Sequence, residues 1–322
     1  MKPKVVVVGS FVQDLSWRCA EFPCAGETVI GRFVSGPGGK GSNQAVAAAR
    51  AGTPTAFVGA VGADGFAQAA RTFHATEKIA AHFVEKSRYA TGTAAILVNQ
   101  FGQNEIVVAL GASEHLEPDD VDHDLLREAK IVVCQHEANL AVNARVFEVA
   151  RKAQVTTLLN PAPMRPDFDP AILSWVDVLI PNEAEFVALL NHPKIQTSAP
   201  SGKLLSESAL QAMPANELQA RCRELGVPTV IVTLGSRGCF VSQATGFTLI
   251  AGHTGLNVVD TTGAGDAFVG GFAAGMVQCD GDVLAAARRG NAIAALSVTK
   301  AGTAPAMPSQ SEIEKFLAVM PC

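Results

Sequence analysis

The sequence predicts an α/β fold, in which a doubly wound, mostly parallel sheet is flanked by helices and carries a small antiparallel β lid. Short, continuous runs of β-branched residues indicate strands that are buried on both faces, as in parallel sheets. Helical patterns lie between these runs, and this alternation is typical of a doubly wound sheet. The predicted strands are Val5–Val8, Thr55–Val58, Ile131–Cys134, Val155–Leu159, Val178–Ile180 and Thr229–Thr233. The predicted helices are Asn43–Ala51, Asn139–Ala153, Glu183–Leu190 and Glu217–Leu225.

Two regions break this alternation, and we expect them to form the lid, at about residues 11–36 and 91–110. The first region is rich in turn residues but contains the strand-like run Thr28–Phe33. The second contains Thr93–Asn99 and Glu105–Ala109, which a glycine-containing turn separates as in a β-hairpin. A hairpin packed on the edge of the core is the alternative to a projecting lid.

Composition and charge argue against several functional classes. The net charge is −5 with a pI near 5.8, and clustered Lys and Arg, which nucleic acids and anionic membranes require, are not present. The seven cysteines are scattered, without a Cys-x-x-Cys pair, which indicates reduced thiols rather than a disulfide framework. The apolar run near the N-terminus is too short for a signal sequence or a membrane span, so we expect a cytoplasmic location. The whole chain, 1–322, is predicted to form a single domain with the lid inserted in it.

A Gly-rich turn near the C-terminus, Thr261–Asp266, is predicted to bind an anion. It follows a short strand-like run, Val258–Asp260, and precedes a helical one, Ala267–Met276. Its small residues allow consecutive backbone N–H groups to approach a ligand, and a helix that begins there adds free amides and the positive end of its dipole. Asp266 is then either a helix cap or, beside a bound phosphate, a base that accepts the proton of an attacking hydroxyl.

Two other phosphate-binding motifs do not match. A Walker A loop requires Gly-x-x-x-x-Gly-Lys followed by Ser or Thr, whereas Lys40 is followed by Gly41. Val34 also occupies the place of the first glycine in that motif. The dinucleotide-binding motif Gly-x-Gly-x-x-Gly fails at Phe268, where the third glycine is required. A nucleotide-dependent dehydrogenase is therefore the less favoured interpretation.

A second Gly-rich segment, Gly36–Ala45, opens the first long helix. Its glycines permit close backbone approach, and Lys40, Asn43 and Gln44 supply the donors and acceptors that carbohydrate hydroxyls need. Asp14, after the first strand, offers a carboxylate that can accept two hydroxyl hydrogen bonds. The structural alternative is a capped, flexible turn, with Asp14 as an ordinary turn former.

Together these segments resemble the ribokinase-like (PfkB) carbohydrate kinase family. The resemblance rests on two signatures in the expected order, Gly38–Ala45 and Asp260–Phe268, and spans nearly the whole chain. It implies a ribokinase-like fold and an enzyme that transfers the γ-phosphate of ATP to a primary hydroxyl of a small sugar, ribose above others. Further matching segments are Pro23–Val29, Asn160–Pro163, Pro181–Glu185 and Thr233–Gly238.

The resemblance implies a role for each matching residue. Asp266 is the expected catalytic base, and the backbone amides of Gly263, Ala264 and Gly265 form the expected anion hole. The expected substrate-binding positions are Asp14, Gly39, Lys40, Asn43 and Glu137. The expected ATP-binding positions are Asn182, Thr233, Gly235, Ser236, Gly238 and Asn291. Without the resemblance, Glu137, Asn182 and Glu185 would be interpreted as helix caps and solvated charges after strand ends.

Two metal ions are expected. Magnesium is required on chemical grounds, because it neutralises the phosphate being transferred, and Glu185 matches the acidic position that the family associates indirectly with it. The family also has a monovalent-cation site beside the anion hole, which favours potassium and is formed mostly by backbone carbonyls. The positions that match this site are Asp260, Thr262, Ser297, Lys300 and Gly302.

One departure from the family concerns the sugar. Ribokinases have an Asn two residues before the sugar-binding Asp, where this chain has Val12, and Phe11 and Trp17 flank the same segment. Loss of a hydrogen-bonding side chain from a hydroxyl-reading site can change specificity greatly. A nucleoside (adenosine-type) kinase, a fructokinase and a sugar-binding regulator without turnover therefore remain open. The lid has an exposed edge, and relatives cover it by lid-to-lid contact, so the resemblance also implies a homodimer.

Overall fold

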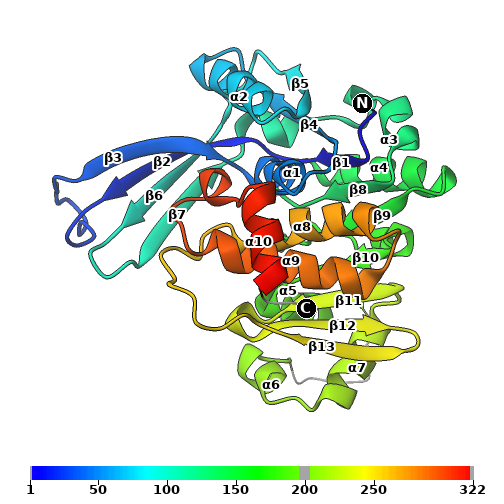
Figure 1. Ribbon diagram of the computed structural model, residues 1–322. Coiled ribbons are helices and arrows are strands. Elements are labelled where there is room, and N and C mark those ends of the chain that lie inside the picture. Colours follow the sequence, from blue (N-terminus) through cyan, green and yellow to red (C-terminus); the bar gives the residue numbers. More distant parts are fainter. Residues whose placement is uncertain (1, 196–203, 320–322) are drawn as a thin grey trace.

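The computed structural model describes residues 2–195 and 204–319, which form a large sheet between two layers of helices (Figure 1). The sheet has nine strands in the order β13-β12-β11-β10-β9-β8-β1-β4-β5. Neighbouring strands from β11 to β5 are parallel, whereas β12 and β13 are added at one edge as antiparallel strands. The strands are β1 (Val5–Val8), β4 (Thr55–Val61), β5 (Ala80–Glu85), β8 (Ile131–Cys134), β9 (Thr156–Leu159), β10 (Val178–Leu179), β11 (Thr229–Thr233), β12 (Gly238–Gln243) and β13 (Gly246–Ala251).

Helices cover both faces of this sheet, which confirms the predicted doubly wound fold. Val5 and Val7 of β1 belong to one hydrophobic cluster and Val6 and Val8 to another, because alternate side chains of a strand point to opposite faces. One face is covered by α1 (Lys40–Arg50), α2 (Gly65–Thr76), α8 (Ala264–Gln278), α9 (Val283–Ser297) and α10 (Gln310–Val319). The other is covered by α3 (His123–Glu128), α4 (Leu140–Lys152), α5 (Glu183–Leu190), α6 (Glu207–Gln211) and α7 (Ala215–Glu224). Short 3₁₀ helices are η1 (Gly111–His115), η2 (Pro118–Asp120), η3 (Pro170–Trp175), η4 (Gly235–Arg237) and η5 (Ala304–Ala306).

The lid is a second sheet of four strands that projects from the body of the molecule (Figure 1). Its order is β3-β2-β6-β7, and the two hairpins β2–β3 and β6–β7 are antiparallel. The hairpin β6–β7 was predicted, whereas strand β2 was not. Where the hairpins meet, β2 and β6 pair in parallel, because both strands run outward from the main sheet. The strand expected at Thr28–Phe33 was wrongly placed, since the pairing begins only at Arg32. The lid strands are β2 (Val12–Arg18), β3 (Arg32–Gly38), β6 (Gly92–Val98) and β7 (Asn104–Ala109).

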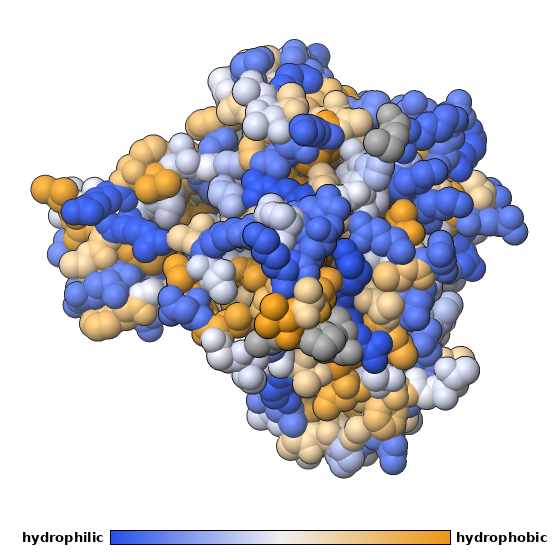
Figure 2. Space-filling view, in the orientation of Figure 1, coloured by the Kyte–Doolittle hydropathy of each residue, from blue (hydrophilic) through white to orange (hydrophobic). Residues whose placement is uncertain are grey.

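Hydrophobic side chains remain exposed on the lid. Figure 2 shows them in orange among polar residues on the projecting part at the left. Ile30 is 97% exposed and Val107 72%, and every residue of the edge strand β7 is exposed. An exposed strand edge with apolar side chains is a surface that another chain can cover.

Two other expectations concern the whole chain. The six cysteines within the described ranges form no disulfide, and burial raises the pKa of the Cys222 and Cys239 thiols to about 12, so both are unreactive core residues. Cys322 lies outside the described residues. Of the helices in the described part of the chain, none has the length and apolar character needed to cross a membrane.

Candidate active site

The Gly-rich turn Thr261–Asp266 leads directly into α8, which begins at Ala264, three residues earlier than predicted. Gly263 is the N-cap residue and has φ of +80°, a left-handed conformation that favours glycine. A Cβ added to Gly265 would find no described atom within 4 Å, so the first turn faces open space. The Ala264 amide donates to the Thr261 carbonyl at 3.2 Å. The amides that follow it in the first turn of α8 remain available to an anion, since helix N-termini leave them without intrahelical partners.

Asp266 does not act as the cap of α8, because Gly263 occupies the N-cap position. Its side chain is 6% exposed and instead accepts hydrogen bonds from α1. Asn43 Nδ2 is 2.9 Å from Oδ2, and Gln44 Nε2 is 3.0 Å from Oδ1. The two helices approach this closely at Gly270, where a Cβ would overlap the Gln44 carbonyl. A buried carboxylate beside free helix amides has the position that a general base for phosphoryl transfer requires.

The strand expected at Val258–Asp260 is not formed. None of the strands in the described part of the chain pairs with this segment. The backbone N–H groups of Val259 and Asp260 instead donate to the Val298 carbonyl at 2.8 and 3.2 Å. The chain is thereby tied to the end of α9 just before it turns into α8.

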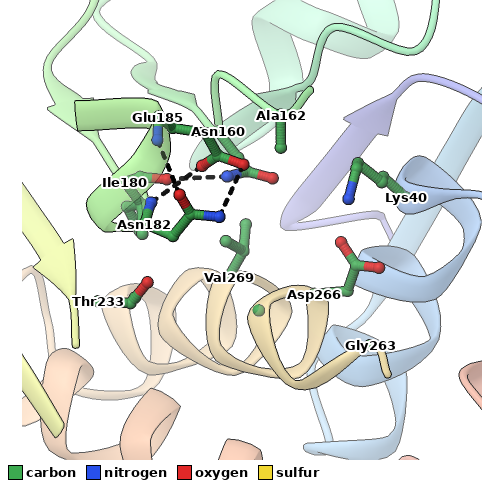
Figure 3. A pocket seen from close by; sticks show the side chains of 11 residues that line it. Lys40, Asn160, Ala162, Ile180, Asn182, Glu185, Thr233, Gly263, Asp266 and Val269 are labelled. Atoms are coloured by element: carbon green, nitrogen blue, oxygen red, sulfur yellow. Dashed lines mark hydrogen bonds between the residues drawn. The ribbon is translucent and has the colours of Figure 1, made fainter. Parts of the chain in front are cut away.

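A pocket opens in front of Asp266, at the carboxyl ends of the parallel strands (Figure 3). Asn160 follows β9. Asn182 follows β10 and forms a β-bridge with Thr233 at the end of β11. In open α/β sheets this edge is where ligands bind. The lining residues are Lys40, Asn160, Ala162, Ile180, Asn182, Glu185, Thr233, Gly263, Gly265, Asp266 and Val269.

Lys40 is the cation of this pocket and lies at the same end as Asp266 (Figure 3). Burial lowers the pKa of its ammonium group, but the nearby carboxylates of Asp266, Glu137 and Glu185 outweigh burial and hold the pKa above its ordinary value. Lys40 is therefore charged at neutral pH. A lysine in this position can attract and orient a phosphate.

Asn182 and Glu185 are both helix-capping and pocket-lining residues. They form a reciprocal capping box at the start of α5, in which Asn182 Oδ1 accepts from the Glu185 amide at 2.8 Å. They also line the pocket with Lys40. Burial raises the pKa of Glu185, and its bond from Asn182 and the charge of Lys40 oppose this only in part. A carboxylate held in place by a cap is a suitable outer partner for a hydrated magnesium ion.

Two further carboxylates, Glu137 and Asp14, lie near this end of the pocket, where they interact electrostatically with Lys40 or Asp266. Glu137 accepts hydrogen bonds from Ser10 Oγ at 2.7 Å and from the Lys40 amide at 2.9 Å, which joins the ends of β1 and β8 to the start of α1. Asp14 accepts from Thr303 Oγ1 at 3.2 Å. Burial raises the pKa of Asp14 to about 6, and the charges of Glu137 and Asp266 add to this effect. The carboxylates of Asp14, Glu137 and Asp266 lie in one region and can accept hydrogen bonds from hydroxyl groups.

We expect Asp14→Asn to stabilise the protein without ligand while it weakens sugar binding. The folded-state pKa of about 6 lies above the ordinary value of 3.8, so the unfavourable buried charge is present above pH 6 and is relieved as the pH falls towards 4. The variant should gain about 1–2 kcal/mol in free energy of unfolding at pH 8. Urea unfolding at pH 8 and pH 4 measures this, and a gain of equal size at both pH values would contradict it.

Several predicted ATP positions lie outside this pocket. Gly235 and Ser236 are in η4, beyond Thr233, and Gly238 begins β12 at a point where a Cβ would overlap the Ile250 carbonyl. Asn291 of α9 is buried and donates to the Ala251 carbonyl at 2.8 Å, so it joins α9 to the end of β13. From these contacts alone, Gly238 and Asn291 would be interpreted as structural residues.

The predicted cation positions come from the turn before α8 and from the end of α9 with the loop that follows it. The Asp260 carboxylate joins them, because it accepts from the amides of Thr262 at 2.9 Å and Gly302 at 3.0 Å. Burial raises the pKa of Asp260, but these hydrogen bonds outweigh it and lower the pKa below its ordinary value. Ser297 and Lys300 use their side chains elsewhere, on the Ala294 carbonyl and on Glu312. Backbone carbonyls therefore remain the candidate ligands, which suits a monovalent ion. Within residues 2–195 and 204–319, no cluster of three or more His, Cys, Asp or Glu side chains is suited to a metal.

The sequence did not single out four polar residues that the structure brings into the site. Each of them contacts a residue that the sequence did single out, through its side chain. Asn160 lies inside a matching segment and was quoted with it, whereas a lone Ser, Gln or Thr in a loop carries no signal of its own. These residues are Ser10, Gln135, Asn160 and Thr303.

Comparison with known proteins gives consistent results along the chain. The family description "pfkB family carbohydrate kinase" matches residues 2–310. A ribokinase of Mus musculus is 36% identical over 315 residues, which are 96% of this chain and 93% of the relative. A deoxyribokinase of Salmonella typhi is 33% identical over 324 residues, covering 98% and 99%. The structure of Arabidopsis thaliana ribokinase complexed with ribose and ATP is 30% identical, with a TM-score of 0.81 over 98% of this chain and 99% of that one.

Proposed function

Since the chain belongs to the pfkB family of carbohydrate kinases, we propose that it transfers the γ-phosphate of ATP to the primary hydroxyl of ribose. The observation that carries the proposal is the position of Asp266, buried in the first turn of α8 beside the open amides of that turn. A sugar-binding regulator would have no need for a buried carboxylate beside a free anion site. The relatives named ribokinase support ribose as the acceptor.

In this reaction the sugar hydroxyl loses its proton to Asp266 as its oxygen forms a bond to the γ-phosphorus. The bond between that phosphorus and the β,γ-bridging oxygen breaks, and its electron pair leaves with ADP. The amides of Gly263, Ala264 and Gly265 stabilise the charge on the transferring group, and Lys40, which lines the same pocket, adds a positive charge. Positioning and electrostatics supply most of the catalysis in such a transfer.

Magnesium is part of this proposal, because the charge of the ATP phosphates must be neutralised during transfer. Glu185 is the residue of this chain that fits it, through water, since its carboxylate lines the pocket and is held by Asn182. Thr233, Gly235, Ser236, Gly238 and Asn291 are the proposed positions along the nucleotide.

Potassium is proposed as an activator at the loops that Asp260 joins. A cation bound there by backbone carbonyls would fix the turn before α8 and so the amides of the anion hole. Replacing sodium by potassium in the assay should raise kcat at constant ionic strength, and equal rates in both salts would remove this proposal.

A second candidate acceptor is 2-deoxyribose, which Val12 favours. Val12 is 2% exposed and lies two residues from Asp14 in β2, so both side chains point to the same face of the lid strand. An apolar side chain at this place leaves a sugar hydroxyl without a partner, which costs less for a deoxy sugar. The relative named deoxyribokinase supports this candidate.

We expect Val12→Asn to raise the ratio of kcat/KM for ribose to that for 2-deoxyribose by about tenfold. Asn restores a donor and an acceptor on the face of Asp14. Coupled assays with ribose, 2-deoxyribose, fructose and adenosine measure the ratio and the preferred acceptor together. An unchanged ratio would show that Val12 does not read the sugar, and turnover of adenosine alone would replace the ribose proposal.

The aromatic residues give little support to a nucleoside acceptor. Phe11 is fully buried and packs against His74 and Phe83 with ring centroids 5.9 and 6.2 Å apart. Trp17 packs against Phe33 in the lid at 5.1 Å. The ring of Phe11 is therefore enclosed by the core rather than presented to a base.

A homodimer through the lid is also proposed, because apolar residues such as Phe33, Val34 and Val107 are exposed there at 54, 62 and 72%. Covering them would bury hydrophobic surface and satisfy the edge strands β3 and β7. Light scattering at assay concentration tests this, and a monomer mass would exclude the dimer.

A further inference from the structure

A chain of buried side-chain amides leads from Asp266 back to the carboxyl edge of the sheet. Gln44 of α1 is fully buried, and its Nε2 lies 3.0 Å from Asp266 Oδ1 and 3.1 Å from Asn160 Oδ1. Its Oε1 accepts from Gln135 Nε2 at 2.6 Å. Asn160 directly follows β9 and Gln135 directly follows β8. The carboxylate on α8 is thus connected through α1 to two neighbouring strands.

The orientation of the Gln44 amide is fixed from both of its ends. Asn160 donates its Nδ2 to the Ile180 carbonyl at 2.8 Å, which leaves its Oδ1 to accept from Gln44. Gln135 donates to the oxygen of the Gln44 amide. A flipped Gln44 would place its oxygen against the Asp266 carboxylate and against Asn160 Oδ1, so that acceptors would face each other. Both partners therefore specify the same orientation, with N–H towards Asp266.

Packing alone does not account for Gln135. Its side chain occupies space that Gly9 leaves open after β1, because a Cβ on Gly9 would overlap the Gln135 Oε1 atom. That Oε1 is buried and has no hydrogen-bond partner among the described residues. A buried oxygen without a partner is unfavourable for folding, and an apolar side chain of the same shape would avoid this cost. The useful group of Gln135 is its N–H, which binds Gln44.

The two oxygens of Asp266 have different surroundings. Oδ1 accepts from Gln44, which is 0% exposed and lies on the interior side. Oδ2 accepts from Asn43, whose own Oδ1 is buried and has no partner in the described part of the chain. Two side-chain amides of α1 thus hold both oxygens of the carboxylate, and the Gln44 amide is the one that the sheet orients.

We propose that Gln44 is a positioning residue of this kinase, and that Gln135 acts on Asp266 through Gln44. The inference rests on the proposed function, since it requires Asp266 to be the base. Gln44 contacts the base and not the substrate, so its loss lets the carboxylate rotate away from the attacking hydroxyl. Such a change lowers the rate of the chemical step and leaves substrate binding nearly unchanged.

The test compares Gln44→Met, Gln135→Met and the double variant, because Met has nearly the same length as Gln and no amide. Gln44→Met should lower kcat by about 10- to 100-fold, with KM for ribose and ATP within about threefold of the original values. Gln135→Met should lower kcat by about 3- to 10-fold. Adding it to Gln44→Met should change kcat by less than about twofold, because residues of one chain of contacts are not additive.

Ser242→Ala is the matched control for the loss of a buried hydrogen bond. Ser242 in β12 is fully buried and bonded to Arg223 Nε at 3.1 Å, away from the pocket. This variant should keep kcat and KM unchanged. Thermal melting checks that each variant is folded, and Gln135→Met alone decides the matter if Gln44→Met does not fold.

An unchanged kcat in Gln44→Met, or in Gln135→Met where only that variant folds, would overturn the inference. So would single effects that multiply fully in the double variant, because Gln135 would then act independently of Gln44. Failure of the proposed function has a different signature, in which Asp266→Asn itself keeps normal turnover. If Asp266→Asn is inactive but Gln44→Met has normal kcat, the proposed function stands and only the positioning role of Gln44 is excluded.

Discussion

Asp266→Asn should lower kcat by about a thousandfold, while the enzyme still binds ribose and ATP. The side chain is buried between two amide donors and the first turn of α8, so it is the carboxylate placed beside the proposed phosphate site to accept the hydroxyl proton. General bases contribute about 10²–10⁴ in rate. Asn has the same shape but accepts a proton far less readily. Initial rates from a coupled ADP assay at saturating substrates measure the loss.

Calorimetric titration with ribose and with ATP provides the control for this variant. Dissociation constants within about threefold of the original values would assign the loss to the chemical step rather than to binding. Near-normal kcat would remove Asp266 as the base and return it to a structural role in joining α1 to α8.

Gly265→Val should lower kcat/KM for ATP by about 100-fold or more without destabilising the fold. A Cβ at Gly265 meets no described atom within 4 Å, so the folded chain itself leaves room for a larger side chain. Gly265 also lines the pocket in front of Asp266, where the transferring phosphate is proposed to bind. A valine there blocks approach to the first amides of α8, and losing one such donor costs about 10²–10³ in rate.

Gly65→Val is the matched control, because Gly65 also lies in the first turn of a helix, α2, and a Cβ there also meets open space. Both variants should melt within a few degrees of the original protein, and only Gly265→Val should lose activity. Equal activity of the two variants would show that the open turn of α8 is not the phosphate site.

The main sheet was predictable because buried parallel strands carry unbroken β-branched runs. Val5–Val8, Ile131–Cys134 and Thr229–Thr233 form strands at the predicted bounds. The edge strand Ala80–Glu85 was not predicted, because it is partly exposed and contains Ala, His and Glu. Helix α9, Val283–Ser297, was also missed, since its small residues give a weak amphipathic pattern. Prediction therefore failed where burial on one face or small side chains weaken the sequence signal.

The lid shows a different limit. The hydrophobic run Thr28–Phe33 was expected to be a strand, but β3 is Arg32–Gly38 and ends in Gly-Pro-Gly. Pro37 is tolerated because β3 is an edge strand of the lid. Gly38 is required because a Cβ there would overlap the Asp14 carboxylate. The sequence Gly-Pro-Gly therefore indicates a turn when it is considered locally, but it belongs to a strand in which Gly38 allows close approach to Asp14.

The candidate site was predictable where its residues lie within the matching segments, as Lys40, Asn182 and Asp266 do. The contacts of Gln135 and Thr303 were not, because both reach the site only through the order of the strands and the path of the C-terminal loop. Which side chains orient the base is thus a property of the packed sheet rather than of any local motif.

The most direct test of the proposed function is phosphorus NMR of the purified protein with ATP, magnesium and ribose. The proposal predicts a new phosphomonoester signal from a ribose phosphate, growing in equal amount with ADP, and its loss in Asp266→Asn. Formation of ADP with inorganic phosphate alone, or no consumption of ATP with ribose or 2-deoxyribose, would contradict it.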